Sequence, residues 1–435
     1  MRTLFFSARP APGLSRKILL AAVTIGAASS LQLAAQQQRA PARAPADGAV
    51  PFTIHVPDDV LSDLKQRLAR TRFTDEIAGA GWDYGVDLAY LKQLVAYWKD
   101  GFDWRAQERR LNQFEQFKIN IDGLNVHFIW RKSKEANAFP LLITHGWPGS
   151  FVEFPKIIGP LTDPVAHGGR AEDAFDVVVP SIPGYGFSDR PRERGYSSTK
   201  MAEIEAKLMA RLGYSRYGAQ GGDWGALIAA PLAINDAAHV AGIHLNMCVA
   251  PPPPGVADPT AGLSPIELER LRSRSSFQTE ETGYSAEQGT KPQTVGAALN
   301  DSPVGLAAWI VEKFKTWCDC DGNPENRFTK DELLTNITLY WVTQTAASSA
   351  RLYYETRRAN TMFPAARIEV PTACAQFPKE IVYTPRRWVE ARYNLKRWTE
   401  FPRGGHFAAL EQPDALVTDV RAFFRELRTP SARPR

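Results

Sequence analysis

The sequence predicts an α/β fold built on a mostly parallel sheet with helices on both faces. Three observations support this prediction. Short apolar segments with the pattern of buried strands alternate with segments of helical period, an order typical of parallel sheets. One such strand runs into a glycine-rich turn at residues 221–225 that opens a helix. A long helical stretch then interrupts the alternation, and we expect it to form a cap over the carboxyl ends of the strands.

An N-terminal extension of helices and a hairpin is predicted for residues 51–135. Residues 56–73 have a helical period, and Asp58 is expected to be the N-cap of this helix. The helical period returns at residues 87–98. Residues 117–130 alternate between apolar and polar side chains around a central Asp-Gly pair, which is a strong signal for a β-hairpin.

The core is expected in two parts, residues 136–250 and 366–435, with the helical cap at residues 251–365 between them. The cap opens with four consecutive prolines at residues 251–254, and an Asp-Ser-Pro sequence at residues 301–303 marks the start of one of its helices. A C-terminal helix is expected at residues 413–427. The predicted core strands are residues 140–146, 176–184, 214–222, 239–247 and 368–377.

Residues 1–50 are predicted to be a signal peptide followed by a disordered linker. Four basic residues precede an uncharged run from residue 18 to residue 38. This run opens with the apolar segment ILLAAVTIGAA, and small residues stand at Ala28 and Ala35. The run is short for a membrane span. We therefore expect a cleaved signal and a secreted or periplasmic protein, the alternative being an uncleaved segment that anchors the chain in a membrane.

The charge of the chain argues against binding to nucleic acid. The chain has 52 basic and 47 acidic residues, but four of the basic residues lie within residues 1–38, which contain no acid. The remaining 48 basic and 47 acidic residues almost balance. No basic face is therefore predicted.

The chain contains four cysteines, which are few for its length. Cys318 and Cys320 stand too close in the sequence for an easy disulfide, and no histidine accompanies them at zinc-finger spacing. We expect all four to be structural or incidental: Cys248, Cys318, Cys320 and Cys374.

Asp223 is the first candidate for catalysis. It stands in a Gly-Gly-Asp-Trp-Gly turn, where proteins of the α/β-hydrolase fold place their nucleophile, usually Ser or Cys. Taken alone, it could be only the N-cap of the next helix. His406 lies before the last helix, where this fold has its base, and Glu380 follows a predicted strand, where the acid that orients the base belongs. The chain order of nucleophile, acid and base matches the fold, although a loop histidine and an exposed glutamate are the alternatives.

Two backbone N–H groups are predicted to form an oxyanion hole. The sequence His-Gly-Trp-Pro-Gly-Ser at residues 145–150 directly follows a predicted strand. The N–H group of Trp147 could therefore pair with that of Trp224, the residue after the candidate nucleophile. An ordinary Gly/Pro turn is the alternative, and the position after the strand favours the functional interpretation.

The sequence resembles the microsomal-type epoxide hydrolases, a branch of the α/β-hydrolase fold. The resemblance extends from residue 51 to residue 427. The sequence WCDCDGNPENRF at residues 317–328 departs from the family pattern. This departure concerns the shape of a cap loop and not the catalytic chemistry. The resemblance is carried by the N-terminal helical region and by HGWPGS at residues 145–150, GGDWG at 221–225, RGGHFAALEQP at 403–413, and two cap stretches at 281–314 and 348–358.

The resemblance implies a helical cap and epoxide hydrolase activity. It implies that Asp223 is the nucleophile, His406 the base and Glu380 the partner of the base. It implies no metal and no organic cofactor, and no cofactor motif is present in the sequence.

The resemblance also implies that Tyr284 and Tyr353 are the paired acids of the cap. Tyr353 rather than the adjoining Tyr354 falls on the family's position, but the doublet leaves the choice open. From the residues alone, these tyrosines would be interpreted as core or surface aromatics. Two phenols with a pKa near 10 stay protonated at neutral pH and can donate to the oxygen of an opening epoxide.

Epoxide chemistry explains why a carboxylate stands where a serine is usual. A carboxylate that opens an epoxide by in-line displacement leaves an ester, which water activated by a base can cleave to give a vicinal diol. A serine would leave an ether, which water does not readily cleave. The expected partners are an apolar epoxide and water. The oligomeric state, including a homo-oligomer, is left open.

Two other functions are consistent with part of the pattern. A haloalkane or haloacid dehalogenase uses the same aspartate and histidine, but it needs halide donors in place of two phenols. A non-catalytic binding protein on the same fold would not need all of these groups. A serine esterase fits less well, because no serine lies in a suitable turn after a strand.

Overall fold

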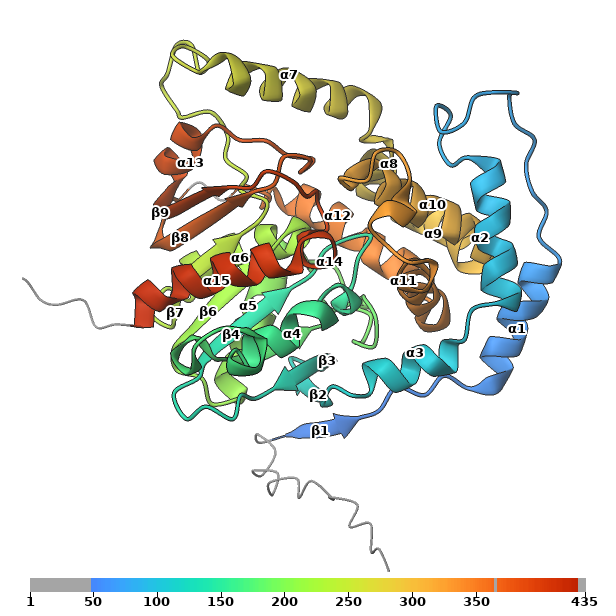
Figure 1. Ribbon diagram of the computed structural model, residues 1–435, viewed down its shortest axis with the longest axis horizontal. Helices are drawn as coiled ribbons and strands as arrows, with labels where there is room; N and C mark the ends of the chain where they lie inside the picture. The colour runs from blue at the N-terminus through green and yellow to red at the C-terminus, as the bar shows by residue number, and fades with distance from the viewer. Residues whose placement is uncertain (1–47, 364–365, 429–435) are drawn as a thin grey trace, which may run out of the picture. The chain divides into compact units, whose positions relative to one another are not determined.

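The computed structural model describes residues 48–363 and 366–428, and its centre is a nine-stranded sheet. The strand order is β1-β2-β3-β5-β4-β6-β7-β8-β9. Strands β4 to β9 run parallel to one another. Strands β1, β2 and β3 form antiparallel pairs at one side, and β3 also pairs antiparallel with β5 (Figure 1). The strands are β1 (Ala49–Phe52), β2 (Gln116–Ile121), β3 (Leu124–Arg131), β4 (Phe139–Thr144), β5 (Phe175–Pro180), β6 (Tyr217–Gly221), β7 (Val240–Leu245), β8 (Ile368–Gln376) and β9 (Tyr393–Glu400).

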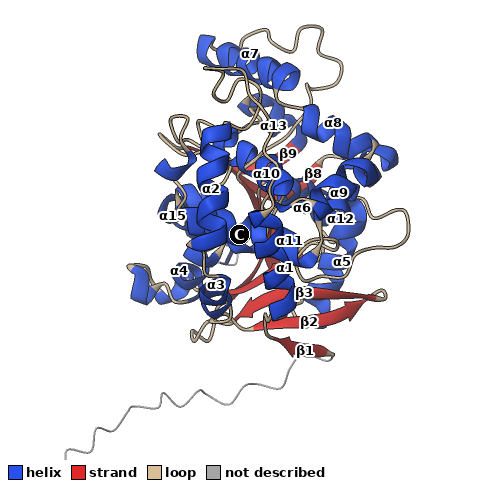
Figure 2. Ribbon diagram, turned by 90° about the vertical axis from the view of Figure 1, so that its right-hand side faces the viewer, coloured by secondary structure: helices blue, strands red, loops and turns tan. Residues whose placement is uncertain are grey.

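Helices cover both faces of the sheet, as predicted. On one face lie α4 (Pro155–Thr162) and α15 (Pro413–Arg428), and on the other lie α5 (Ser198–Arg211) and α6 (Asp223–Asn235) (Figures 1 and 2). The parallel strands are near-continuous apolar runs because side chains on both of their faces are buried. The α/β fold class is therefore confirmed.

The predicted hairpin is also present. Strands β2 and β3 are joined by Asp122 and Gly123, whose φ angles are 50° and 86°. Both angles lie in the left-handed region that a two-residue hairpin turn of this kind requires, which is why an Asp-Gly pair is favoured there.

The segment between β7 and β8 is largely helical, in agreement with the predicted cap. Two of its long helices, α10 and α11, begin at strong caps. Ser302 accepts a hydrogen bond from the N–H of Gly305, and Thr329 forms a reciprocal capping box with Glu332. The helices are α7 (Pro265–Glu280), α8 (Gly283–Thr290), α9 (Pro292–Asp301), α10 (Pro303–Trp317), α11 (Lys330–Thr343) and α12 (Ala346–Ala359); α13 (Arg386–Arg392) and α14 (Ala408–Glu411) follow later in the chain.

The N-terminal helices pack against the cap helices. Helices α1 (Asp58–Ala69) and α2 (Leu88–Asp100) contact α10, and α2 and α3 (Trp104–Leu111) contact α11 (Figure 1). One of these contacts is a hydrogen bond of 2.8 Å from the Tyr97 hydroxyl to Asp331 Oδ1. The helix at Asp58 was predicted correctly, but Asp58 is its first residue and not its N-cap, which is Pro57.

The four cysteines are structural, which was one of the two expectations. The structure pairs Cys318 with Cys320 and Cys248 with Cys374 in two disulfides. The expectation that Cys318 and Cys320 stand too close for an easy disulfide was therefore wrong. Both sulfurs lie near the carbonyl oxygen of Lys315 in the last turn of α10, at 3.5 Å and 3.4 Å.

The predicted signal peptide and most of the predicted linker lie outside the described residues. In residues 48–363 and 366–428, no helix combines the length and the apolar character that a membrane crossing needs. The expected location of the protein therefore stays a prediction.

Candidate active site

The candidate nucleophile stands on a sharp turn between a strand and a helix. Strand β6 ends at Gly221 and α6 begins at Asp223, whose φ angle of 50° lies in the left-handed region. Gly225 permits close packing behind the turn, because a Cβ at Gly225 would overlap the carbonyl oxygen of Thr144. The N-cap of α6 is Gly222, so the alternative that Asp223 is merely a capping residue does not hold.

The structure brings Asp223, His406 and Glu380 together in the order that the sequence suggested. The distance from His406 Nε2 to Asp223 Oδ2 is 3.3 Å, and His406 Nδ1 lies 2.7 Å from Glu380 Oε1. The side chains of His406 and Glu380 are each only 3% exposed. A histidine in this position can pass a proton between the candidate nucleophile and water while Glu380 fixes the orientation of its ring.

The two carboxylates hold His406 in its charged form. Burial by itself lowers the pKa of His406, but the negative charges of Glu380 and Asp223 and their hydrogen bonds outweigh burial and raise that pKa well above its usual value. If Asp223 loses its charge by forming an ester, one of the two stabilising charges disappears. The pKa of His406 should then fall, which suits a base that acts only after the ester has formed.

The turn after β4 supplies a donor to the same carboxylate. The backbone N–H of Trp147 donates to Asp223 Oδ1 at 2.8 Å. Strands β4 and β6 are parallel neighbours, so their carboxyl ends place this turn beside Asp223. The second predicted donor, the N–H of Trp224, belongs to the first turn of α6, where backbone N–H groups have no partner within the helix.

Helix α11 of the cap fixes the conformation of this turn. Asn336 donates to the carbonyl oxygen of Pro148 at 2.7 Å and accepts from the Ser150 hydroxyl at 2.7 Å. The Tyr340 hydroxyl donates to the carbonyl oxygen of Gly149 at 2.7 Å. Sequence reasoning missed both of these cap residues, because neither belongs to a local motif.

The two candidate cap acids lie in one aromatic cluster above the nucleophile. The Tyr284 ring stacks on Trp147 at 5.0 Å, and the Tyr353 ring meets Trp224 at 4.7 Å and Tyr284 at 6.0 Å. Tyr353 and Tyr284 are only 6% and 9% exposed. The structure separates Tyr353 from its neighbour Tyr354, whose ring lies beneath the Arg358 guanidinium instead.

Both phenols are held protonated. Burial raises the pKa of Tyr284 and of Tyr353, and the negative charge of Asp223 raises both further. The hydroxyl groups of the two tyrosines also interact with one another. Two neutral phenols beside a carboxylate can act as hydrogen-bond donors or as acids toward an oxygen that becomes negative.

A small cavity borders the candidate nucleophile and base. It is lined by Asp223, His406, Glu153 and Asn246 among other residues, and its volume is about 20 Å³. A space of that size holds roughly one water molecule, and these polar side chains provide partners for it.

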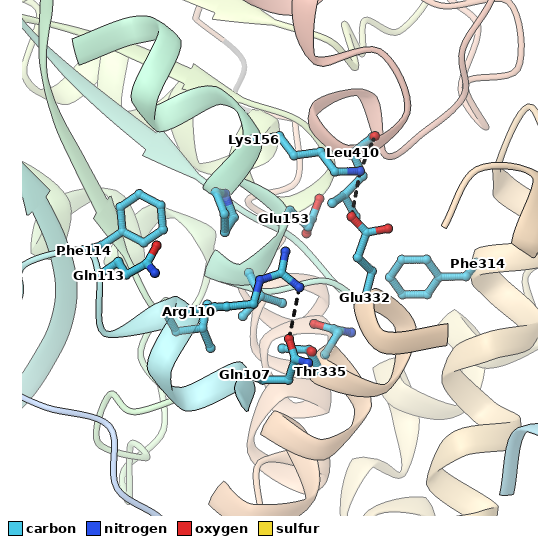
Figure 3. A pocket seen from close by; sticks show the side chains of 14 residues that line it. Gln107, Arg110, Gln113, Phe114, Glu153, Lys156, Phe314, Glu332, Thr335 and Leu410 are labelled. Atoms are coloured by element: carbon cyan, nitrogen blue, oxygen red, sulfur yellow. Dashed lines mark hydrogen bonds and ion pairs between the residues drawn. The ribbon is translucent and has the colours of Figure 1, made fainter. Parts of the chain in front are cut away.

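Glu153 separates this small cavity from a larger one. It ends the 3₁₀ turn η1 (Phe151–Glu153), and its carboxylate occupies the space left by the missing side chain of Gly149. The larger cavity has a volume of about 260 Å³ and is bordered by Arg110 of α3 and Glu332 of α11. Figure 3 shows Glu153 directed into it. A lone acid among Phe151, Val152 and Phe154 was the signal in the sequence that could have singled out this residue.

The environment of Glu153 predicts a pH-dependent stability. Burial raises its pKa from about 4.5 to about 8, and nearby Asp223 adds to this effect against the opposing charge of His406. The folded state therefore binds the proton more tightly than the unfolded state, and stability is lost as the pH rises from about 4.5 through 8. Glu153→Gln cannot ionise. We expect its melting temperature to equal that of the wild type near pH 4.5 and to exceed it by about 2–5 °C at pH 8.5.

The measurement is thermal unfolding of both proteins across this pH range. Glu369→Gln serves as the control, because the side chain of Glu369 is 72% exposed and should give no pH-dependent difference. A constant difference between Glu153→Gln and the wild type at all pH values would contradict the prediction.

The fold and the site together define a class of protein. A carboxylate on the turn between a central parallel strand and its helix, a histidine and acid from late in the chain, and a donor from the turn after β4 are the arrangement of an α/β-hydrolase. Among the described residues, no cluster of three or more His, Cys, Asp or Glu side chains could hold a metal ion.

Comparison with known proteins identifies the family within this class. The family model described as "Epoxide hydrolase N terminus" matches residues 49–154, and "alpha/beta hydrolase fold" matches residues 140–431. Epoxide hydrolase 1 of Sus scrofa is 43% identical over 410 residues, which cover 88% of this chain and 90% of that protein. The chain belongs to the epoxide hydrolases, and the resemblance to their microsomal type is confirmed.

Comparison with solved structures identifies the same family. The juvenile hormone epoxide hydrolase of the silkworm Bombyx mori superimposes with a TM-score of 0.82 at 36% identity, covering 88% of this chain and 95% of that chain. The epoxide hydrolase of Aspergillus niger gives a TM-score of 0.79 at 33% identity, covering 88% and 97%. The protein is therefore an enzyme of the epoxide hydrolase family, and the alternatives of a dehalogenase and of a non-catalytic binding protein are set aside.

Proposed function

We propose that this enzyme converts apolar epoxides to vicinal diols through a covalent ester of Asp223. The observation that carries the proposal is the position of one carboxylate among three kinds of partner. Asp223 Oδ1 accepts from Trp147 N at 2.8 Å, its Oδ2 lies 3.3 Å from His406, and two buried phenols stand above it in the cap. An ordinary structural aspartate needs none of these partners.

In the first step, an oxygen of Asp223 attacks an epoxide carbon and the carbon–oxygen bond of the ring breaks. The hydrogen bond from Trp147 leaves Oδ2 as the freer oxygen for this attack. The electron pair of the broken bond stays on the epoxide oxygen, and Tyr284 and Tyr353 donate hydrogen bonds and one proton to it. The products of this step are a hydroxyalkyl ester of Asp223 and one tyrosinate. Because the ester removes the charge of Asp223, His406 gives up its proton, which passes to the tyrosinate and leaves His406 neutral.

In the second step, water cleaves the ester at its carbonyl carbon. His406, whose ring is oriented by Glu380, removes a proton from the water as it attacks. The N–H groups of Trp147 and Trp224 stabilise the tetrahedral oxyanion. The diol leaves, Asp223 is restored as a carboxylate, and His406 keeps the proton taken from water, as in the resting enzyme. The cycle therefore consumes only epoxide and water.

The small cavity supports this second step. It adjoins Asp223 and His406 and has room for about one water molecule. Glu153 borders it and is protonated at neutral pH, since burial raises its pKa to about 8. A neutral carboxyl group can hydrogen-bond to the water without repelling the carboxylate of Asp223.

The surroundings of the phenols support an apolar substrate. The rings of Trp147, Tyr284, Trp317, Tyr353 and Trp224 form one contiguous aromatic cluster. Such a lining favours the hydrocarbon part of an epoxide, while the two hydroxyl groups recognise its oxygen.

Isotope labelling tests the covalent route. With enzyme in excess over styrene oxide in ¹⁸O-water, we expect the diol from a single turnover to contain no ¹⁸O, because its new oxygen comes from Asp223. The peptide that contains Asp223 should gain the label instead, as measured by mass spectrometry. Enzyme kept in ¹⁸O-water without epoxide should stay unlabelled. A labelled diol together with an unlabelled enzyme would show direct attack by water and end the proposal.

A further inference from the structure

The end of α10 lies directly against the loop that carries His406. The N–H of His406 donates to the carbonyl oxygen of Trp317 at 3.0 Å, and the N–H of Gly404 donates to Asp319 Oδ2 at 2.8 Å. The backbones are so close at Gly405 that a Cβ there would lie 2.6 Å from the oxygen of Trp317. This cap segment, residues 317–320, is part of the sequence that departs from the family pattern.

A buried carboxylate ties the two segments together. Glu411 accepts hydrogen bonds from the N–H groups of Asp319 at 2.8 Å, Gly405 at 3.0 Å and Phe407 at 3.0 Å. Glu411 is 8% exposed, so water does not compete freely for these bonds. A shift of Asp319 would therefore be transmitted to the residues on both sides of His406.

The same segment touches the candidate base through a side chain. The Trp317 ring lies 5.1 Å from the His406 ring in an edge-on arrangement. It also lies 5.2 Å from the ring of Tyr284. Trp317 thus contacts His406 both through its backbone and through its ring.

The Cys318–Cys320 disulfide closes a small ring around Asp319 alone. A disulfide that closes so short a loop removes little freedom from the unfolded chain, so it contributes little to global stability. Its effect is local, since it restricts the backbone of Asp319. Cys318 is 7% exposed and Cys320 is 1% exposed, so both cysteines are buried, and an exposed turn at residues 321–323 follows the ring.

We propose that the Cys318–Cys320 disulfide is a redox-sensitive brace that holds the His406 loop in the geometry needed for ester hydrolysis. This inference rests on the proposed function, in which His406 activates water in the second step. A dithiol reductant opens the Cys318–Cys320 disulfide by thiol–disulfide exchange. One thiolate of the reductant attacks a cysteine sulfur and releases the other cysteine as a thiolate; the second thiol of the reductant then forms its own disulfide and releases the first cysteine. Two electrons pass from the reductant to the protein.

Reduction should slow the second step much more than the first. Asp223 is positioned by β6, α6 and Trp147, none of which belongs to the brace. Asp223 therefore keeps its position, whereas the His406 loop loses a support for its backbone. Among the described residues, the braced segment reaches the groups of the first step only through packing of the Trp317 ring against Tyr284 and Trp147. Small misplacements of a reacting group cost large factors in rate. We expect hydrolysis of the ester to slow about tenfold and its formation to change less than about twofold.

The experiment measures both steps in single-turnover reactions with styrene oxide, before and after treatment with dithiothreitol, and follows the ester by mass spectrometry. In the Cys318→Ser/Cys320→Ser variant we expect slow hydrolysis from the outset and no response to dithiothreitol. The matched control is Cys248→Ser/Cys374→Ser, which lacks the other disulfide and should keep the response. Circular dichroism checks that each protein is folded. The serine variant removes the brace without any need for the reductant to reach it.

The outcomes are distinguishable. Accumulation of ester in the reduced enzyme and in the Cys318→Ser/Cys320→Ser variant supports the brace. Hydrolysis at the wild-type rate in that variant overturns it, and so does an equal slowing of both steps, which indicates a general structural role. If the oxidised wild type forms no ester at all, the proposed function itself fails and the brace fails with it.

Discussion

The Asp223→Ala variant is expected to lose more than about 10⁴-fold of its kcat/KM for styrene oxide while it remains folded. Alanine removes the oxygen that forms the ester, so no covalent intermediate can accumulate. Water could attack the epoxide directly only in a site that is not arranged for it, because His406 Nε2 is directed at the carboxylate of Asp223, 3.3 Å from Oδ2. Steady-state kinetics and thermal unfolding together test this prediction.

The control for this variant is Asp59→Ala, which replaces an exposed aspartate in the first turn of α1. It should retain wild-type activity. Turnover by Asp223→Ala at a rate within tenfold of the wild type would show that Asp223 is not the nucleophile and would remove the basis of the two-step reaction.

The Tyr284→Phe/Tyr353→Phe variant is expected to show the second-largest loss. Each single change should slow formation of the ester by about 10-fold to 100-fold, and the double change by more than about 10³-fold. In each single variant, the remaining phenol can still donate to the epoxide oxygen. In the double variant no phenol remains, so the oxygen must leave as an unprotonated alkoxide in a buried, apolar site. Rapid-mixing measurements of ester formation separate this effect from a slower hydrolysis.

Tyr354→Phe is the matched control, because it removes the same atom from the next residue. The ring of Tyr354 lies under Arg358 and not against Trp224 or Trp147. Its rate should stay within about twofold of the wild type. If Tyr353→Phe formed the ester at the wild-type rate and Tyr354→Phe formed it slowly, Tyr354 would be the second cap acid in place of Tyr353.

Much of the fold follows from local signals in the sequence. Strands buried on both faces need long apolar runs, and the Asp-Gly pair at the hairpin supplies the positive φ angles that its turn requires. Strands β1 and β9 were not predicted, because β1 has four residues and β9 contains mainly polar and half-buried side chains. Such strands are defined by their neighbours in the sheet and not by their own pattern.

The sequence by itself determined the α/β fold class, the helical insertion and the identity of Asp223, Glu380 and His406 as candidates, since each stands at a position that the chain order of the fold marks. The tertiary structure decided which of the adjoining tyrosines faces the nucleophile, the contacts of Asn336 and Glu153 near it, and the pairing of Cys318 with Cys320. The physical reason is the sequence separation between the residues that produce each signal. Helix period, strand pattern and turn type depend on a few neighbouring residues. Burial, hydrogen-bond partners and pKa shifts depend on residues that only folding brings together.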